Sequence, residues 1–234
     1  RPSFQPEIRP LSGKVAFSIP SDRFEPLAAR YSPDGALIAT TTRRNLLCLY
    51  DAKTGALVRE CEAPNSSCPW TIRFTADGSK VLSGNWNRAI YVWDVATGKT
   101  VRRLEGHRGL VTAIDFRPRE PDILASAAAD GRIMLWDLSL PQNTPVLTLD
   151  ALDGWEAWAM DFDKAGRRLL ATNSVGTTVI WDLRHFNRHI GGNMLTQLRL
   201  HRDALGPQFN ESAAMEQRSL LLSRGKRPPP TAAR

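Results

Sequence analysis

Three residue types that together can perform nucleophilic catalysis occur within one short stretch of this 234-residue chain. His107, Ser126 and Asp130 are the residue types of a hydrolase triad, in which a carboxylate orients the histidine that takes the proton of a serine hydroxyl. Trp136 follows closely and adds an indole N–H donor. The same four side chains could instead form a buried hydrogen-bonded chain without a catalytic role. The elements that position them decide between the two interpretations.

Other residues match known chemical sites less well. Gly98–Thr100 imitates the end of a phosphate-binding loop, but the first glycine of that motif is missing and no helix is expected to follow. The potential metal ligands elsewhere are three histidines and three cysteines, namely His185, His189, His201, Cys48, Cys61 and Cys68. The histidines lack partner carboxylates or thiols near them, and the cysteines lack CxxC spacing. We therefore expect neither a cofactor nor a metal site nor a disulfide framework.

The stretch from Gly106 to Asp137 has the pattern of consecutive antiparallel strands. The hydrophobic runs VTAIDF, DILASA and RIMLW are separated by turn residues. Asp130-Gly131 is a strong hairpin signal, because a type I′ turn needs positive φ at both central positions.

The same pattern recurs along the chain with intervals of 43, 43 and 45 residues. Its anchors are four aromatic–Asp pairs, namely Tyr50-Asp51, Trp93-Asp94, Trp136-Asp137 and Trp181-Asp182. A turn, the aromatic strand end before it and a small-residue strand after it recur in phase with these pairs. The pattern predicts three-strand cores at residues 28–51, 70–94, 111–137 and 158–182, and a fourth strand after each of the first three pairs.

These repeats resemble the WD40 repeat, in which each repeat forms one four-stranded blade of an all-β propeller. The resemblance implies that Trp136 donates its indole N–H to Ser126, which links to His107 and then to Asp130. We therefore expect this set to be a structural network and not a catalytic one. In the other repeats the position of Asp130 is occupied by Arg44, Asn87 and Val175. We expect those repeats to depend on apolar packing alone.

We expect three regions: a flexible segment at 1–11, WD40-type propeller blades at 12–182, and a basic tail at 183–234 that is partly helical and partly disordered. Residues 12–17 have the character of an outer strand, one period before the strand that follows Gly55. Val15–Phe17 can complete the fourth blade and close a four-bladed ring, or it can finish a preceding blade of a larger ring. We favour the larger ring, because WD40 proteins mostly have about seven blades.

The net charge of +7 is concentrated in the tail. Residues 183–234 contain nine Arg or Lys and three Asp or Glu, whereas 22 basic and 21 acidic residues precede them. A nucleic-acid-binding face needs clustered positive charge, so we expect none on the propeller, although the tail could contact acidic partners. The sequence contains no apolar run of membrane-spanning length, and residues 1–10 lack the apolar core of a signal peptide. We expect a cytoplasmic protein.

Tryptophan and arginine side chains outside the repeat motif are the best candidates for partner binding, because both types are enriched at interaction hot spots. In WD40 propellers, the turn between the second and third strands and the entry to the first strand line the usual partner-binding face. The residues that the resemblance places there are Trp86, Trp155, Trp70, Arg43, Arg44 and Arg88. Trp70 and Trp158 could instead pack between blades.

We expect a non-catalytic scaffold that binds protein partners and is a module of a larger regulatory protein. The Thr97–His107 and His185–Asn193 segments look similar to those of bacterial multidomain WD-repeat proteins, in which a propeller often accompanies a kinase or another catalytic domain. Two alternatives are a chromatin or nucleic-acid adaptor that uses the basic tail and the propeller of a kinase-linked signalling protein. An enzyme would need polar residues converging at the channel mouth, and no paired carboxylates or metal ligands are evident there.

Overall fold

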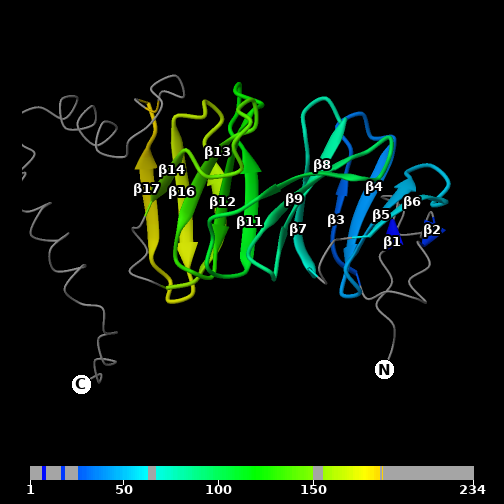
Figure 1. Ribbon diagram of the computed structural model, residues 1–234, viewed down its shortest axis with the longest axis horizontal. Coiled ribbons are helices and arrows are strands. Elements are labelled where there is room, and N and C mark those ends of the chain that lie inside the picture. The colour runs from blue at the N-terminus through cyan, green and yellow to red at the C-terminus, as the bar shows by residue number, and fades with distance from the viewer. Residues whose placement is uncertain are drawn as a thin grey trace, which may run out of the picture. The chain divides into compact units, whose positions relative to one another are not determined.

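A computed structural model describes residues 7–8, 17–18, 26–62, 67–149, 155–184 and 186 of the chain. The regular elements among these residues are all β-strands, and they form four antiparallel sheets and one separate two-stranded sheet (Figure 1). Each of the four predicted repeats forms one sheet. The all-β fold with four successive blades is therefore confirmed.

The strands of each sheet follow one another in chain order, so every pairing is local. The first sheet contains β3 (Pro26–Tyr31), β4 (Leu37–Thr42), β5 (Leu46–Asp51) and β6 (Leu57–Glu62). The second contains β7 (Pro69–Phe74), β8 (Lys80–Asn85), β9 (Ile90–Asp94) and β10 (Thr100–Leu104). The third contains β11 (Val111–Phe116), β12 (Ile123–Ala128), β13 (Ile133–Asp137) and β14 (Leu147–Leu149). The fourth contains β15 (Ala157–Phe162), β16 (Arg168–Asn173) and β17 (Thr178–Asp182).

The aromatic residue of each anchor pair has the same register in all four sheets. It stands opposite an aliphatic residue of the preceding strand, in the pairs Ile38–Tyr50, Val81–Trp93, Leu124–Trp136 and Leu169–Trp181. Because side chains alternate between the two faces of a strand, this shared register lets the four sheets be compared position by position.

The aspartate of each anchor pair caps a turn. The Oδ1 atom of Asp94 accepts the backbone N–H of Thr97 at 2.8 Å, and Asp51 does the same for Thr54 at 2.8 Å. These side-chain bonds satisfy backbone donors that the sheet leaves unpaired at the turn into the outer strand. The aspartates of the repeat are therefore turn-forming residues.

Consecutive sheets pack face to face, with the first strands β3, β7, β11 and β15 as neighbours. Ala125 and Leu135 of the third sheet are fully buried, because the fourth sheet covers them. The equivalent residues of the fourth sheet, Leu170 and Ile180, are 38% and 63% exposed. Burial of a strand in this fold thus depends on the sheet that follows it.

The pairing of Phe17 differs from one of the two predicted arrangements, in which Val15–Phe17 completes the fourth blade. Phe17 and Ser18 (β2) pair with Glu7 and Ile8 (β1), and the fourth sheet has three described strands. The segment that includes Phe17 therefore does not complete the fourth sheet in the described part of the chain. A local pairing costs less loop-closure entropy than one with a strand roughly 160 residues away.

The predicted helical and disordered tail lies outside the described residues, apart from residues 183, 184 and 186. Within the described part, no helix has the length and apolar character that a membrane span requires.

Candidate functional site: a buried polar chain and an exposed tryptophan–arginine cluster

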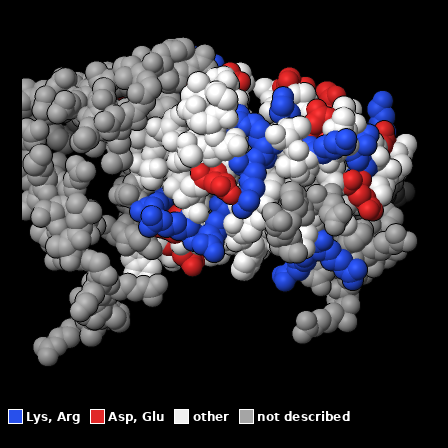
Figure 2. Space-filling model, viewed as in Figure 1, with Lys and Arg blue, Asp and Glu red and all other residues white. Residues whose placement is uncertain are grey.

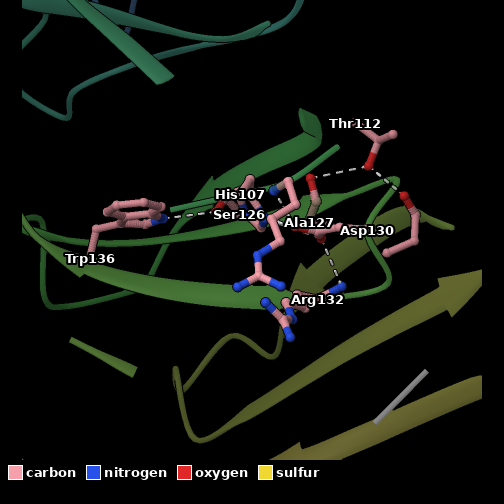
Figure 3. A network of polar contacts seen from close by, with 9 residues as sticks. His107, Thr112, Ser126, Ala127, Asp130, Arg132 and Trp136 are labelled. Carbon is pink, nitrogen blue, oxygen red and sulfur yellow. Dashed lines mark hydrogen bonds and ion pairs between the residues drawn. The ribbon is translucent and has the colours of Figure 1, made fainter. Parts of the chain in front are cut away.

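The third sheet brings His107, Ser126, Asp130 and Trp136 together in one hydrogen-bonded chain (Figure 3). Trp136 Nε1–H donates to Ser126 Oγ at 2.8 Å, and Ser126 Oγ lies 2.7 Å from His107 Nε2. His107 Nδ1 lies 3.2 Å from an Asp130 carboxylate oxygen. Strand β12 holds the serine, β13 the tryptophan, the turn between them the aspartate, and the segment before β11 the histidine.

The protonation pattern of this chain follows from its carboxylate. Burial opposes the ionisation of Asp130, but the hydrogen bond and charge of His107 and the N–H groups of Arg108 (2.6 Å) and Arg132 (3.1 Å) outweigh it and lower the pKa. An ionised Asp130 only accepts hydrogen bonds, so His107 Nδ1 is the donor between them. In the neutral histidine, Nε2 then accepts the hydroxyl proton of Ser126.

The enclosure of these residues is inconsistent with a hydrolase site. The side chain of His107 and the whole of Ser126 are inaccessible to solvent, and the Asp130 side chain is only 8% exposed. A catalytic serine must reach a substrate carbonyl, whereas Ser126 Oγ is enclosed between an indole and an imidazole. This arrangement can hold β12, β13, the turn between them and the segment before β11 together, because these four side chains satisfy one another's polar groups.

The second sheet uses a different polar arrangement at equivalent positions. Ser83 is the counterpart of Ser126, but its Oγ lies 2.9 Å from Asn85 Nδ2 and 3.1 Å from Asn85 Oδ1, both within hydrogen-bond distance. Asn87, the counterpart of Asp130, donates to the hydroxyl of Tyr91 at 2.9 Å. Trp93 Nε1 is buried and has no hydrogen-bond partner among the described residues.

The first sheet has a buried tyrosine at the anchor position. Burial raises the pKa of the Tyr50 hydroxyl, and the nearby Cys48 thiol raises it further. Burial raises the pKa of the Cys48 thiol to about 11, so this thiol is a neutral core group. The expectation that the other repeats depend on apolar packing alone is wrong for the second sheet, where side-chain hydrogen bonds occur at the equivalent positions. In the second sheet, the side-chain amides of Asn85 and Asn87 and the hydroxyl of Tyr91 take the place of the missing His and Asp. The repeat motif alone did not reveal these contacts.

The first strand of each sheet contains a charged position that the repeat motif did not identify. The residue before the aromatic strand end is Arg30 in β3, Arg73 in β7, Asp115 in β11 and Asp161 in β15. Arg73 Nε lies 3.3 Å from Asp115 Oδ1, which links the second and third sheets. Burial raises the pKa of Asp115 although Arg73 opposes this. The recurrence of charge at one register position was the signal that could have identified this pair.

An aromatic pair of one partly buried and one exposed tryptophan lies at the start of the second sheet. The rings of Trp70 and Trp86 meet edge to face, with centroids 6.1 Å apart. Trp86, in the turn between β8 and β9, is 57% exposed. Its backbone N–H donates to the carbonyl of Cys68 at 3.1 Å, which fixes the turn against the entry to β7.

Three arginines lie in turns at the same end of the sheets. Arg43 and Arg44 are exposed in the turn between β4 and β5, and Arg88 is exposed two residues after Trp86. Arg88 has a φ of 72°, a left-handed conformation that ends this tight turn. The charge of Arg43 acts on the Cys68 thiol, whose sulfur lies 3.9 Å from the carbonyl of Thr42. The turn at Arg43 and the segment at Cys68 are therefore neighbours. We call Trp70, Trp86, Arg43, Arg44 and Arg88 the Trp–Arg cluster.

The other extra tryptophans are exposed in the fourth sheet. Trp155 is 52% exposed, next to the exposed Glu156, and Trp158 on β15 is 46% exposed. Ser174 N–H donates to the Glu156 carbonyl, so the turn that contains the exposed Val175 adjoins Trp155. Trp155 precedes β15 of the fourth sheet, whereas the Trp–Arg cluster belongs to the first and second sheets. The structure thus divides the six predicted partner-binding residues into two groups.

The remaining candidates offer no chemical site in the described part of the chain. Gly98–Thr100 lies at the turn between β9 and β10, as expected, with the Gly98 N–H donating to the Asp94 carbonyl. Groups of three or more potential metal ligands are absent from the described residues. The histidines at 185, 189 and 201 lie outside them.

Comparisons with known proteins agree with the sheet structure. The family model "WD domain, G-beta repeat" matches residues 55–94 and 98–137. Transducin beta-like protein 3 of Bos taurus is 28% identical over 175 residues, which is 74% of this chain and 22% of the relative. The human U5 small nuclear ribonucleoprotein 40 kDa protein is 35% identical over 71 residues, covering 30% of this chain and 18% of the relative.

A solved structure of U3-55K has a TM-score of 0.62 and 18% identity, and covers 70% of this chain and 50% of that one. This likeness concerns the fold. The chain spans less than a quarter of the length of each of the two curated relatives.

Proposed function

Because the chain is a WD40-repeat protein, we propose that it is a non-catalytic scaffold that holds protein partners, as a cytoplasmic module of a larger regulatory protein. In this proposal residues 12–182 supply the blades, and 1–11 and 183–234 flank them. The coarse role agrees with the relatives, whose names include a ribonucleoprotein component. The partner-binding face is formed by the turns that contain Trp86 and the three cluster arginines and by the strand entries at Trp70 and Trp155.

The observation that supports this proposal best is the exposure of Trp86. The indole of Trp86 is 57% exposed in a tight turn, so much of its apolar surface contacts water in the free protein. A partner that covers this surface gains the free energy of apolar burial. The edge-to-face contact with Trp70 and the bond to the Cys68 carbonyl hold it in place. A partner therefore meets a preorganised ring, which lowers the entropy lost on binding.

Affinity capture with the Trp86→Ala variant tests the proposal. We expect the variant to keep the melting temperature of the wild type, because the side chain is exposed, and to lose partners that the wild type captures from a lysate of its source. Val101→Ala, which removes an exposed apolar side chain from the outer strand β10, is the matched control and should retain them. Equal capture by all three proteins would overturn the proposal.

A second candidate function, a nucleic-acid adaptor, depends on the tail. Its nine basic and three acidic residues favour contact with phosphates. Deletion of residues 203–234, which removes five of the nine basic residues, tests it, because binding through phosphates should weaken steeply with salt and weaken further without these residues. Salt-sensitive binding to DNA or RNA that the deletion leaves unchanged would exclude this role for residues 203–234.

A further inference from the structure

The Trp–Arg cluster has a uniform charge. The turn at 43–45, the entry segment at 67–70 and the turn at 86–89 contain three arginines and no aspartate or glutamate. All three arginines are exposed. The charged side chains that these three segments place around Trp86 are therefore all basic.

The surroundings of Trp155 have the opposite character. Residues 155–156 and the turn at 174–177 contain Glu156 and no lysine or arginine. Two exposed tryptophans at equivalent ends of different sheets thus lie in different electrostatic environments. Apolar exposure alone would not distinguish them, so the arginines give the Trp–Arg cluster a chemical preference that Trp155 lacks.

We propose that the Trp–Arg cluster binds an acidic peptide segment, with an apolar side chain of the peptide against Trp86 and its carboxylates against Arg88 and the neighbouring arginines. Arginine forms forked, charge-assisted hydrogen bonds with carboxylates. Tryptophan supplies the central apolar contact of many interfaces. This inference rests on the proposed function and adds the chemistry of the partner.

A peptide fits these observations better than a nucleic acid. Phosphate backbones are tracked by an extended basic stripe, whereas the residues before Leu183 contain 22 basic and 21 acidic side chains. On the face shown in Figure 2, basic and acidic side chains are interspersed, without a broad area of one sign. The cluster is a local basic site of three arginines in short turns, which matches a short acidic segment.

Fluorescence anisotropy with synthetic peptides on the full chain tests the inference. The probe is a labelled peptide of Glu and Asp residues around one Phe; the comparison peptides replace the acids with Gln and Asn, or the Phe with Gly. We expect each replacement to weaken binding by about tenfold, and Trp86→Ala or Arg88→Asn to do the same. Asparagine is chosen because it tolerates the left-handed backbone at this position.

Two matched variants serve as controls. Lys99→Gln removes an exposed cation from the same sheet at the opposite end of β9, and Val101→Ala removes an exposed apolar side chain from β10. Both should bind the acidic peptide as the wild type does. Binding should also weaken with salt, because the carboxylate contacts are exposed.

Three results would overturn the inference: no binding of the acidic peptide, equal binding of the acidic and amide peptides, or tighter binding of a labelled oligothymidylate that Arg88→Asn abolishes. If Trp86→Ala still loses captured partners in such a case, the proposed function stands and only the acidic preference fails. If Trp86→Ala also keeps its captured partners, both fail.

Discussion

The second and third sheets have the same strands, register and anchor tryptophan, yet they satisfy their buried polar atoms differently. In the third sheet Ser126 Oγ accepts from Trp136 and also joins His107. In the second sheet Ser83 Oγ bonds to Asn85, and Trp93 Nε1 has no described partner. The difference teaches that a repeat position fixes where a polar atom lies, while its neighbours fix whether that atom stabilises the sheet.

The largest expected effect comes from removing the serine of each sheet. Ser126→Ala leaves the Trp136 N–H and His107 Nε2 buried without partners, so we expect a loss of about 3 kcal/mol of unfolding free energy. Ser83→Ala should cost only about 1 kcal/mol, since Asn85 keeps the carbonyls of Ser83 and Ala89 as acceptors. Urea unfolding of both variants measures the contrast. Equal losses would show that the two arrangements stabilise the fold alike.

Substitutions of His107 and Asp130, at the charged end of the hydrogen-bonded chain in the third sheet, should have the next largest effect on stability. His107→Ala or Asp130→Ala should each lower the unfolding free energy by about 2 kcal/mol, because a buried acceptor or donor loses its partner. Asn87→Ala, at the position equivalent to Asp130, should cost less than about 1 kcal/mol because Asn87 is only partly buried. Thermal unfolding followed by circular dichroism tests this, and an unchanged melting temperature in His107→Ala would contradict the assigned network.

The contribution of the Asp130 charge should depend on pH. Its folded pKa lies below the usual value, so its stabilising effect is present above the unfolded pKa of about 3.9 and is lost as the pH falls through the lower folded pKa. Asp130→Asn should therefore melt below the wild type near neutral pH, and the two curves should converge below about pH 4. Other carboxylates are common to both proteins and cancel in the difference. A gap that is constant with pH would argue against an ionised Asp130.

The smallest effect is a gain. Ala171 of the fourth sheet occupies the position of Ser126, two residues from Leu169, which stands opposite the partly buried Trp181. Ala171→Ser offers the indole N–H an acceptor and should stabilise the protein by about 0.5 kcal/mol, at the low end for a hydrogen bond because water can already reach this tryptophan. Differential scanning calorimetry can resolve such a shift. Destabilisation would mean that the fourth sheet does not reproduce the geometry of the third.

Much of the fold was predictable, because the period of the aromatic–Asp pairs and the alternation of apolar residues are local properties. The strand bounds around Trp93 and Trp136 agree with the predicted cores to within a few residues. The contacts of Ser83 were missed, although Ser83 and Asn85 are two residues apart and thus share a face of β8. The contact of Trp70 with Trp86 was also not predicted, because it depends on how a turn folds back over the entry to a strand.

The sequence by itself determined the repeat, the sheets and the turns, since these follow from residue spacing and from backbone preferences within one repeat. Only the tertiary structure decided which polar atoms of that repeat are satisfied and which tryptophans remain exposed. A hydrogen bond requires its partner at about 3 Å, and burial requires a second sheet against the first, as the contrast between Leu135 and Ile180 shows. Both depend on segments of other strands and sheets, which the spacing within one repeat does not specify.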